Sequence, residues 1–185
     1  MADHSPTTAA ALRGKLLVAT PKLKRTMWEE SVILLTQHSA AGAVGYVINR
    51  TSNTTINTLY NNLDYYNNPD YSQLIRLGGP VRERSISMLH SGDWYSASTQ
   101  PVTSAISHSY DDFMLEKMAM LDTPQEFIML AGSAQWAPRQ LEKELAQGSW
   151  LTLESNTAIV FANKPENTWA NCLEIYSQTM FDEFF

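Results

Sequence analysis

The chain has 185 residues, of which 44% are hydrophobic and 17% are charged, and its formal net charge is -6. This composition is typical of one globular domain, and a domain of this size buries a core without help from a metal or a disulfide. An acidic chain repels phosphate backbones, so direct contact with nucleic acid is not expected.

Cysteine usage and the lengths of the apolar runs indicate a cytoplasmic protein. The one cysteine, Cys172, excludes an internal disulfide and a cysteine-based metal cluster. The chain does not start like a secretory signal, and no apolar run approaches the roughly 20 residues of a membrane-spanning helix. We therefore expect no membrane contact, a flexible segment over residues 1–12, and a single domain over residues 13–185.

The first half of the chain alternates short apolar runs with turns. Residues 15–20 form an apolar run that Pro21 ends, which indicates a buried strand. Two β-branched runs, 31–37 and 44–49, are joined by small residues with a glycine, which favours a hairpin. A short helix is expected next, followed by three more strands. These elements are placed at 56–63, 74–77, 86–90 and 102–108.

The second half is richer in helix signals. Ser109 is the expected N-cap of a helix that carries Leu115, Met118 and Leu121 at helical spacing. The run 126–131 predicts a strand that ends at Gly132.

Two further helices are expected after this strand. Pro138 suits the first turn of one of them, and Gly148 suits its end. Short strands are expected at 150–153 and 158–161, around a turn at Asn156. The last helix is expected to begin at Asn163, and its apolar face is formed by Trp169, Cys172, Leu173 and Tyr176.

These elements do not follow regular βαβ alternation. Seven to nine strands and three or four helices are expected, and the strands at the start of the chain are adjacent. This order favours an antiparallel or mixed sheet with helices packed outside it. The predicted fold class is α/β, of the α+β kind.

Ser133 is the residue most similar in position to a hydrolase nucleophile, because it lies between a predicted strand and a predicted helix. The nucleophile elbow requires a glycine two residues before and two residues after the serine, and these positions hold Ala131 and Gln135. We therefore expect no catalytic group formed by Ser133 with His38 and His90. Each of these histidines ends an apolar run, where a hydrogen bond to the backbone is more typical than a role as a general base.

The sequence predicts no cofactor, no metal and no catalytic residue. No phosphate-binding loop occurs, and Gly42 and Gly45 lack the spacing of a dinucleotide fingerprint. The histidines are too far apart in sequence to form a local pair of metal ligands.

We expect structural positions, at the surface or in the core, for the acidic and aromatic side chains. Glu142 and Glu144 do not share one helix face, so they are expected to be solvated. Trp136, Trp150 and Trp169 are expected to pack in the core.

Three stretches, in order, resemble the AlgH/YqgE family of bacterial proteins. The first spans 12–50 and includes the motif Gly-Ala-Val-Gly-Tyr-Val-Ile-Asn-Arg, the second is Leu-Gly-Gly-Pro-Val at 77–81, and the third spans 130–145. The sequence departs from the family at the turn after Pro21, at Ser133 and Gln135, and in its last residues. The resemblance implies a curled sheet that forms a partial barrel with helices outside, and it implies no enzyme assignment, because the family has no established activity.

The first functional hypothesis is a non-enzymatic regulatory or binding protein that acts through a small-molecule or protein partner. The alternative is a hydrolase-like enzyme with a groove near the glycine turns. Some family members are labelled transcriptional regulators, but the residues show no helix-turn-helix pattern, so a DNA-associated role ranks third. A monomer or weak homodimer is expected. The candidate functional surface consists of Asn49, Gly78, Gly79, His90, Gly132, Ser133 and Trp136.

Two further predictions concern the glycines and the tail. Gly42, Gly45, Gly78, Gly79 and Gly132 are expected at turns or at close backbone contacts. The tail 180–185 is rich in phenylalanine, so we expect it either to fold back on its own domain or to dock on another subunit or partner.

Overall fold

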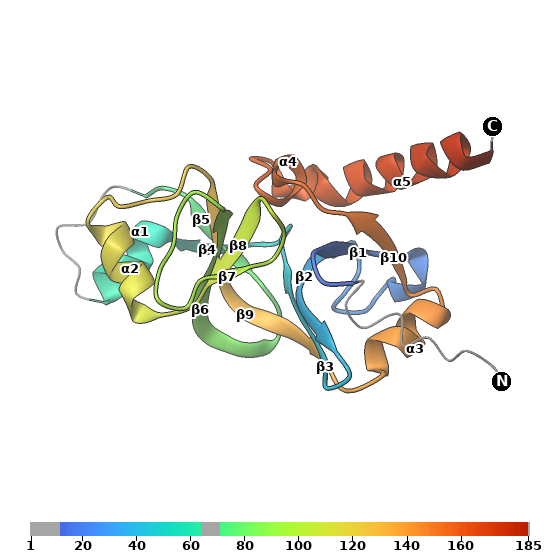
Figure 1. The fold of residues 1–185 in the computed structure, drawn as a ribbon, viewed down its shortest axis with the longest axis horizontal. Coiled ribbons are helices and arrows are strands. Elements are labelled where there is room, and N and C mark those ends of the chain that lie inside the picture. The colour runs from blue at the N-terminus through green and yellow to red at the C-terminus, as the bar shows by residue number, and fades with distance from the viewer. Residues whose placement is uncertain (1–11, 64–70, 185) are drawn as a thin grey trace.

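The computed structural model describes residues 12–63 and 71–184, and its strands join into one curled, mainly antiparallel sheet (Figure 1). The strand order is β10-β1-β2-β3-β9-β6-β8-β7, and β5 adds to β9 in parallel and carries β4. The strands are β1 (Lys15–Ala19), β2 (Val32–Ser39), β3 (Gly42–Val47), β4 (Thr51–Thr55), β5 (Leu74–Leu77), β6 (Val81–Ser91), β7 (Gln100–Pro101), β8 (Ile106–Ser109), β9 (Phe127–Trp136) and β10 (Trp150–Glu154).

Five α-helices lie outside the sheet. They are α1 (Ile56–Asn62), α2 (Asp112–Ala119), α3 (Gln140–Ala146), α4 (Thr157–Val160) and α5 (Thr168–Phe184). In Figure 1, α1 and α2 lie at one end of the sheet, while α3 and α5 lie on either side of the other end. The predicted fold class, a largely antiparallel curled sheet with outer helices, is confirmed. The described residues contain ten strands and five α-helices, where seven to nine strands and three or four helices were expected.

Strands β1 and β2 are buried on both faces. Leu16 and Val18 belong to one apolar cluster, under α5, and Leu17 and Ala19 belong to another, against α3. All four side chains are fully buried, which explains why the sequence shows a continuous apolar run here and no alternation. A third cluster lies under α1 and α2.

Strand β9 joins the two ends of the sheet. Its first half pairs with β6 and β5, and its second half pairs with β3. The prediction that this strand ends at Gly132 is wrong. Gly132 has a φ of +73° and sits inside the strand, where it changes the direction of the backbone.

Four other expected boundaries are corrected. Residues 158–161 fall on α4 and its C-cap, not on a strand, because the Asn156 side chain accepts a hydrogen bond from the Ile159 N–H at 2.9 Å and so caps a helix. Ser109 is buried in β8, and the N-cap of α2 is Asp111. Pro138 precedes α3, whose N-cap is Arg139, and Asn163 precedes a 3-10 turn over Pro165–Asn167.

Two predictions concern the ends of the chain, a flexible segment over residues 1–12 and a tail over residues 180–185 that packs or docks. The flexible segment predicted over residues 1–12 lies, except for Leu12, outside the described residues. In the tail, Met180 and Phe181 continue α5, with 37% and 66% of their surface exposed. These two side chains do not fold back on their own domain, and the side chains of residues 183–185, to which the same prediction applies, lie outside the described residues.

Candidate functional site

The glycine turn after β5 packs directly on β9. The Gly78 N–H donates to the Ala131 carbonyl at 2.8 Å, and the Val47 N–H donates to the Gly78 carbonyl at 2.9 Å. A Cβ on Gly79 would lie 2.3 Å from the Ser133 carbonyl carbon, and one on Gly132 would lie 2.3 Å from the Gly79 oxygen. Only glycine permits this backbone approach, which fixes β3, β5 and β9 together.

The other three predictions about glycines also hold. Gly42 has a φ of +123°, and a Cβ on Gly78 would meet the Gly132 oxygen at 2.4 Å. A Cβ on Gly45 would meet the Leu34 carbonyl oxygen at 2.9 Å. The prediction that these glycines lie at turns or close backbone contacts is confirmed.

Strand β6 bulges where it passes Gly132. Val81 pairs with Ser133 and Ile86 pairs with Ala131, so the four residues between them, 82–85, arch away from β9. Arg82 in this arch has a φ of +52°, a left-handed conformation that costs an arginine about 1–2 kcal/mol. Backbone strain of this kind is concentrated at binding and catalytic sites.

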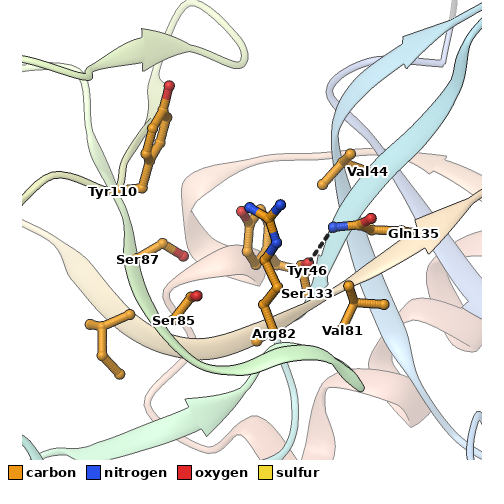
Figure 2. Close-up of a pocket in the computed structure, with 11 residues that line it drawn as sticks. Val44, Tyr46, Val81, Arg82, Ser85, Ser87, Tyr110, Ser133 and Gln135 are labelled. Atoms are coloured by element: carbon orange, nitrogen blue, oxygen red, sulfur yellow. Dashed lines mark hydrogen bonds between the residues drawn. The ribbon is translucent and has the colours of Figure 1, made fainter.

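The arch covers a pocket of about 280 Å³, which we call the Arg82 pocket. Figure 2 shows the Arg82 side chain over the pocket, in front of Tyr46, with Ser133 and Gln135 on the β9 side and Ser85 and Ser87 on the β6 side. The lining residues are Val44, Tyr46, Val81, Arg82, Ser85, Ile86, Ser87, Tyr110, Gly132, Ser133 and Gln135. This lining contains one cation and no carboxylate.

One buried polar group of the Arg82 pocket, the Ser87 hydroxyl, lacks a protein partner, while the Arg82 side chain is exposed to solvent. Among the described residues, Arg82 forms no ion pair, and the buried Ser87 Oγ has no hydrogen bond of good geometry. The Ser133 Oγ accepts a hydrogen bond of 3.2 Å from Gln135 Nε2. Buried polar groups without partners are uncommon in folded proteins and call for an explanation.

Tyr46 and Tyr110 are arranged around a buried histidine. The ring of His108 lies 4.7 Å from the Tyr46 ring and 5.5 Å from the Tyr110 ring, measured between centroids. Burial and, to a smaller extent, repulsion from His90 lower the pKa of His108 to about 4, so His108 is neutral at pH 7. Burial raises the pKa of Tyr46, with a smaller opposing effect of the nearby Ser87 hydroxyl, so the phenol stays a hydrogen-bond donor.

On the other side of the glycine turn lies a second depression of about 490 Å³, which we call the Leu77 groove. Its apolar lining includes Leu77 and Met27, which are about half exposed. Glu83 and Arg84, from the same arch as Arg82, lie on its rim. The full lining is Met27, Trp28, Val47, Arg50, Leu77, Gly79, Pro80, Glu83, Arg84 and Ala131.

The structure brings together only part of the predicted surface. Gly132 and Ser133 line the Arg82 pocket, and Gly79 lines the Leu77 groove. Gly78 packs against the carbonyl of Gly132. Ser133 lies in the middle of a strand and not at a turn between a strand and a helix, so it is not on an elbow at all.

Asn49, His90 and Trp136 lie apart from the Arg82 pocket, and each has a structural role. The Asn49 side chain accepts from the Val32 N–H and donates to the Glu30 carbonyl, both at 2.8 Å, so it fixes the loop before β2. His90 is fully buried beyond the pocket lining. Its Nδ1 lies 2.8 Å from the Ser91 carbonyl, which confirms the predicted backbone hydrogen bond.

Trp136 belongs to a cluster with Trp28 and Trp150, in which neighbouring ring centroids lie 6.1–6.4 Å apart. Glu144 accepts hydrogen bonds from the indole N–H of Trp136 at 3.0 Å and of Trp150 at 2.9 Å. We call these four side chains the tryptophan cluster. The prediction that Glu144 is solvated is wrong, because its carboxylate is the acceptor for two buried indoles.

His38 and Glu142 also form a contact that the sequence did not indicate. His38 Nε2 lies 2.8 Å from Glu142 Oε1, which links β2 to α3. In the part of the chain that the structure describes, no group of three or more His, Cys, Asp or Glu side chains is placed to hold a metal ion.

Sequence reasoning missed Tyr46, Arg82, Ser87 and His108. Ser85 and Ser87 are spaced as residues on one face of a strand, which was the only local signal. Arg82 enters the site through a bulge, and the register of β6 against β9 determines where that bulge forms.

The fold and the Arg82 pocket define an α+β protein with a curled sheet and a small polar pocket at the junction of its two ends. Residues 16–180 match the family described as AlgH-like, and the chain belongs to this family. It is 32% identical to a UPF0301 protein of Methylococcus capsulatus, over 91% of this chain and 93% of the relative. It is 30% identical to a UPF0301 protein of Shewanella loihica, over 89% and 90%. The names of these relatives state a family and no reaction.

Solved structures agree with this assignment. The solution structure of the AlgH protein from Pseudomonas aeruginosa superposes with a TM-score of 0.76 at 28% identity, covering 94% of this chain and 92% of that one. A crystal structure of a protein from Corynebacterium diphtheriae, at 20% identity and a TM-score of 0.71, covers 93% and 88% and shares the fold. Among the described residues, no helix is both long and apolar enough to cross a membrane.

Proposed function

We propose that this chain is a binding protein without enzymatic activity, and that it holds a small oxyanion ligand, a carboxylate or a phosphate, in the Arg82 pocket. The observation that carries the proposal is the exposed guanidinium of Arg82, which forms no ion pair among the described residues and lies over a pocket whose lining has no carboxylate. A guanidinium donates two parallel hydrogen bonds to a planar carboxylate or to a phosphate. Hydroxyl groups of Tyr46, Ser85 and Ser87 supply further donors to the same ligand.

The charge of the rest of the chain supports the same ligand class. The formal net charge is -6, yet the lining of this pocket has a formal charge of +1. A local positive charge attracts anions to this part of an otherwise acidic molecule. Neutral His108 under the pocket adds no second positive charge at pH 7.

The hydrolase alternative is less well supported by the same geometry. A serine nucleophile needs a base within hydrogen-bond reach, and the side chain that contacts Ser133 Oγ is the amide of Gln135. An amide does not accept a proton at neutral pH.

A DNA-associated role is disfavoured by the acidic net charge. We also propose a cytoplasmic location, because the single cysteine, Cys172, is free and buried.

The test is a titration of the full chain with inorganic phosphate and, separately, with acetate, followed by calorimetry or by NMR of backbone amides. Binding should move the resonances of residues 82–87 and 132–135. Replacing Arg82→Gln removes the charge and should weaken binding at least about tenfold, the equivalent of 1.4 kcal/mol.

Arg84→Gln is the matched control, because Arg84 lies two residues away in the same arch but lines the Leu77 groove. Equal loss of binding in both variants would show that only the net charge matters. Absence of binding by the unmodified chain to either anion at millimolar concentration would refute the proposal.

A further inference from the structure

The last turns of α5 project from the part of the chain that the structure describes. The first half of the helix packs on the sheet through Thr168 and Cys172, which are almost fully buried, and the Trp169 indole donates to the Ala19 carbonyl at 2.9 Å. From Ser177 to Asp182 every residue is exposed, and Figure 1 shows this end extending beyond the body of the molecule. Isolated helical turns are marginal in water and gain most of their stability from packing.

This exposed helix end is apolar and acidic at once. Phe181 has 66% of its surface exposed and Met180 has 37%, and Asp182 follows them. The sequence then continues with Glu183, and no lysine or arginine occurs after Lys164. The surface that covers this segment must therefore offer an apolar depression with a positive charge at its edge.

The Leu77 groove has these properties. Leu77 and Met27 expose 46% and 53% of their surface, and its volume of about 490 Å³ has room for a large apolar side chain. The charged residues of its lining, Arg50, Glu83 and Arg84, give it a formal charge of +1, and Arg84 is exposed and forms no ion pair among the described residues. Arg50 is not available in the same way, since it donates to the carbonyls of Met27 and Glu29 and holds one wall of the groove.

We infer that the Leu77 groove accepts the end of α5 from a second copy of this chain. Phe181 enters the apolar part of the groove, and Asp182 lies near Arg84. A helix end on one copy and a groove on another form two different surfaces, so two copies that exchange their helices close the contact into a two-fold dimer. This inference is independent of the proposed oxyanion ligand.

Analytical ultracentrifugation of the full chain over a range of concentrations measures the dimer directly. We expect a reversible dimer whose dissociation constant rises at least about tenfold in Phe181→Asp and in Leu77→Asp. Two controls introduce the same aspartate elsewhere. Phe113→Asp changes an exposed phenylalanine of α2, and Leu74→Asp changes a β5 residue of similar exposure that lies outside the Leu77 groove.

Two further measurements separate this contact from other modes of association. A mixture of Phe181→Asp chains with Leu77→Asp chains retains one intact helix and one intact groove, so it should dimerise more tightly than either variant alone. Arg84→Glu should weaken the dimer, and Asp182→Arg in the same chain should restore it.

A chain that stays monomeric at all accessible concentrations overturns the inference, because the occupant of the groove is then not a second copy. Dimers that Phe181→Asp weakens but Leu77→Asp does not would place the helix end on a different surface, which also overturns it. Since phosphate titration of the monomeric Phe181→Asp variant still reports on the Arg82 pocket, failure of one proposal does not entail failure of the other.

Discussion

Two sites on β9, one at Ser133 and one at Trp136, differ in whether their polar groups have partners within the protein. In the tryptophan cluster, the indole N–H groups of Trp136 and Trp150 both donate to Glu144. In the Arg82 pocket, Ser87 Oγ has no hydrogen bond of good geometry and Arg82 has no ion pair among the described residues. A polar network that is complete within the protein stabilises the fold, whereas the buried Ser87 hydroxyl calls for an explanation, which the proposed ligand would supply.

The difference has a cause in the backbone. Near Trp136, β9 pairs in regular register with β3, so side chains meet at fixed spacing. Near Ser133, the arch over residues 82–85 opens the ladder with β6 and leaves a pocket in the sheet. An irregular strand next to a regular one thus divides β9 into a structural part and a part that lines the pocket of the proposed ligand.

The largest expected effect concerns the buried histidine beneath the Arg82 pocket. The pKa of His108 is about 4 in the folded protein, against 6.5 for an unperturbed histidine. The unfolded chain therefore binds this proton first, so the contribution of His108 to stability is complete above pH 6.5 and declines as the pH falls toward 4. The loss is about 3 kcal/mol by the linkage relation.

Denaturant unfolding at pH values between 7 and 4 measures this loss, and His108→Phe should remove most of it. Asp111, whose pKa of about 2 reflects hydrogen bonds from Ser96 and Ser98 that outweigh the opposing effect of burial, loses its contribution only below about pH 4. An unchanged pH profile in His108→Phe would mean that other groups control acid stability.

The next effect tests the claim that the tryptophan cluster is structural. Replacing Glu144→Leu leaves two indole N–H groups without an acceptor, and we expect a loss of about 2 kcal/mol in the free energy of unfolding. Glu144→Gln retains a carbonyl acceptor and should lose about half as much. Lys143→Leu, on the exposed face of the same helix, is the control.

Urea titrations followed by tryptophan fluorescence give these values, and phosphate binding in the Arg82 pocket should remain unchanged. If Glu144→Leu weakened phosphate binding while stability stayed the same, the division of β9 into two parts would be wrong.

The sequence predicted the structural part better than the binding part. The runs 15–20 and 31–37 are continuous apolar segments because β1 and β2 are covered on both faces, and burial of this kind is visible locally. The glycine pattern was also informative, since close backbone contact demands glycine at Gly79 and Gly132.

The Arg82 pocket could not be predicted in the same way. It depends on a shift in the register between β6 and β9, where Val81 pairs with Ser133 but Ile86 pairs with Ala131. These paired residues are distant in sequence. Gly132 was predicted to end the strand because a glycine that follows an apolar run usually marks a turn. Its left-handed conformation inside β9 follows from the glycine turn that crosses it, and that contact is also distant in sequence.

The smallest expected effect is also the sharpest test of the comparison. Arg82 adopts a left-handed conformation that glycine adopts without strain, while glycine costs more chain entropy on folding. Arg82→Gly should therefore leave the free energy of unfolding unchanged or raise it by up to about 1 kcal/mol, as the strain is released. The same change removes the only cation of the Arg82 pocket lining and should abolish phosphate binding.

Chemical denaturation and phosphate titration of the Arg82→Gly variant measure its stability and its binding. If the arginine lowers stability and is required for binding, its role is functional. Loss of stability in Arg82→Gly would instead make the arginine part of the structural framework, like Glu144, and the contrast between the two parts of β9 would no longer hold.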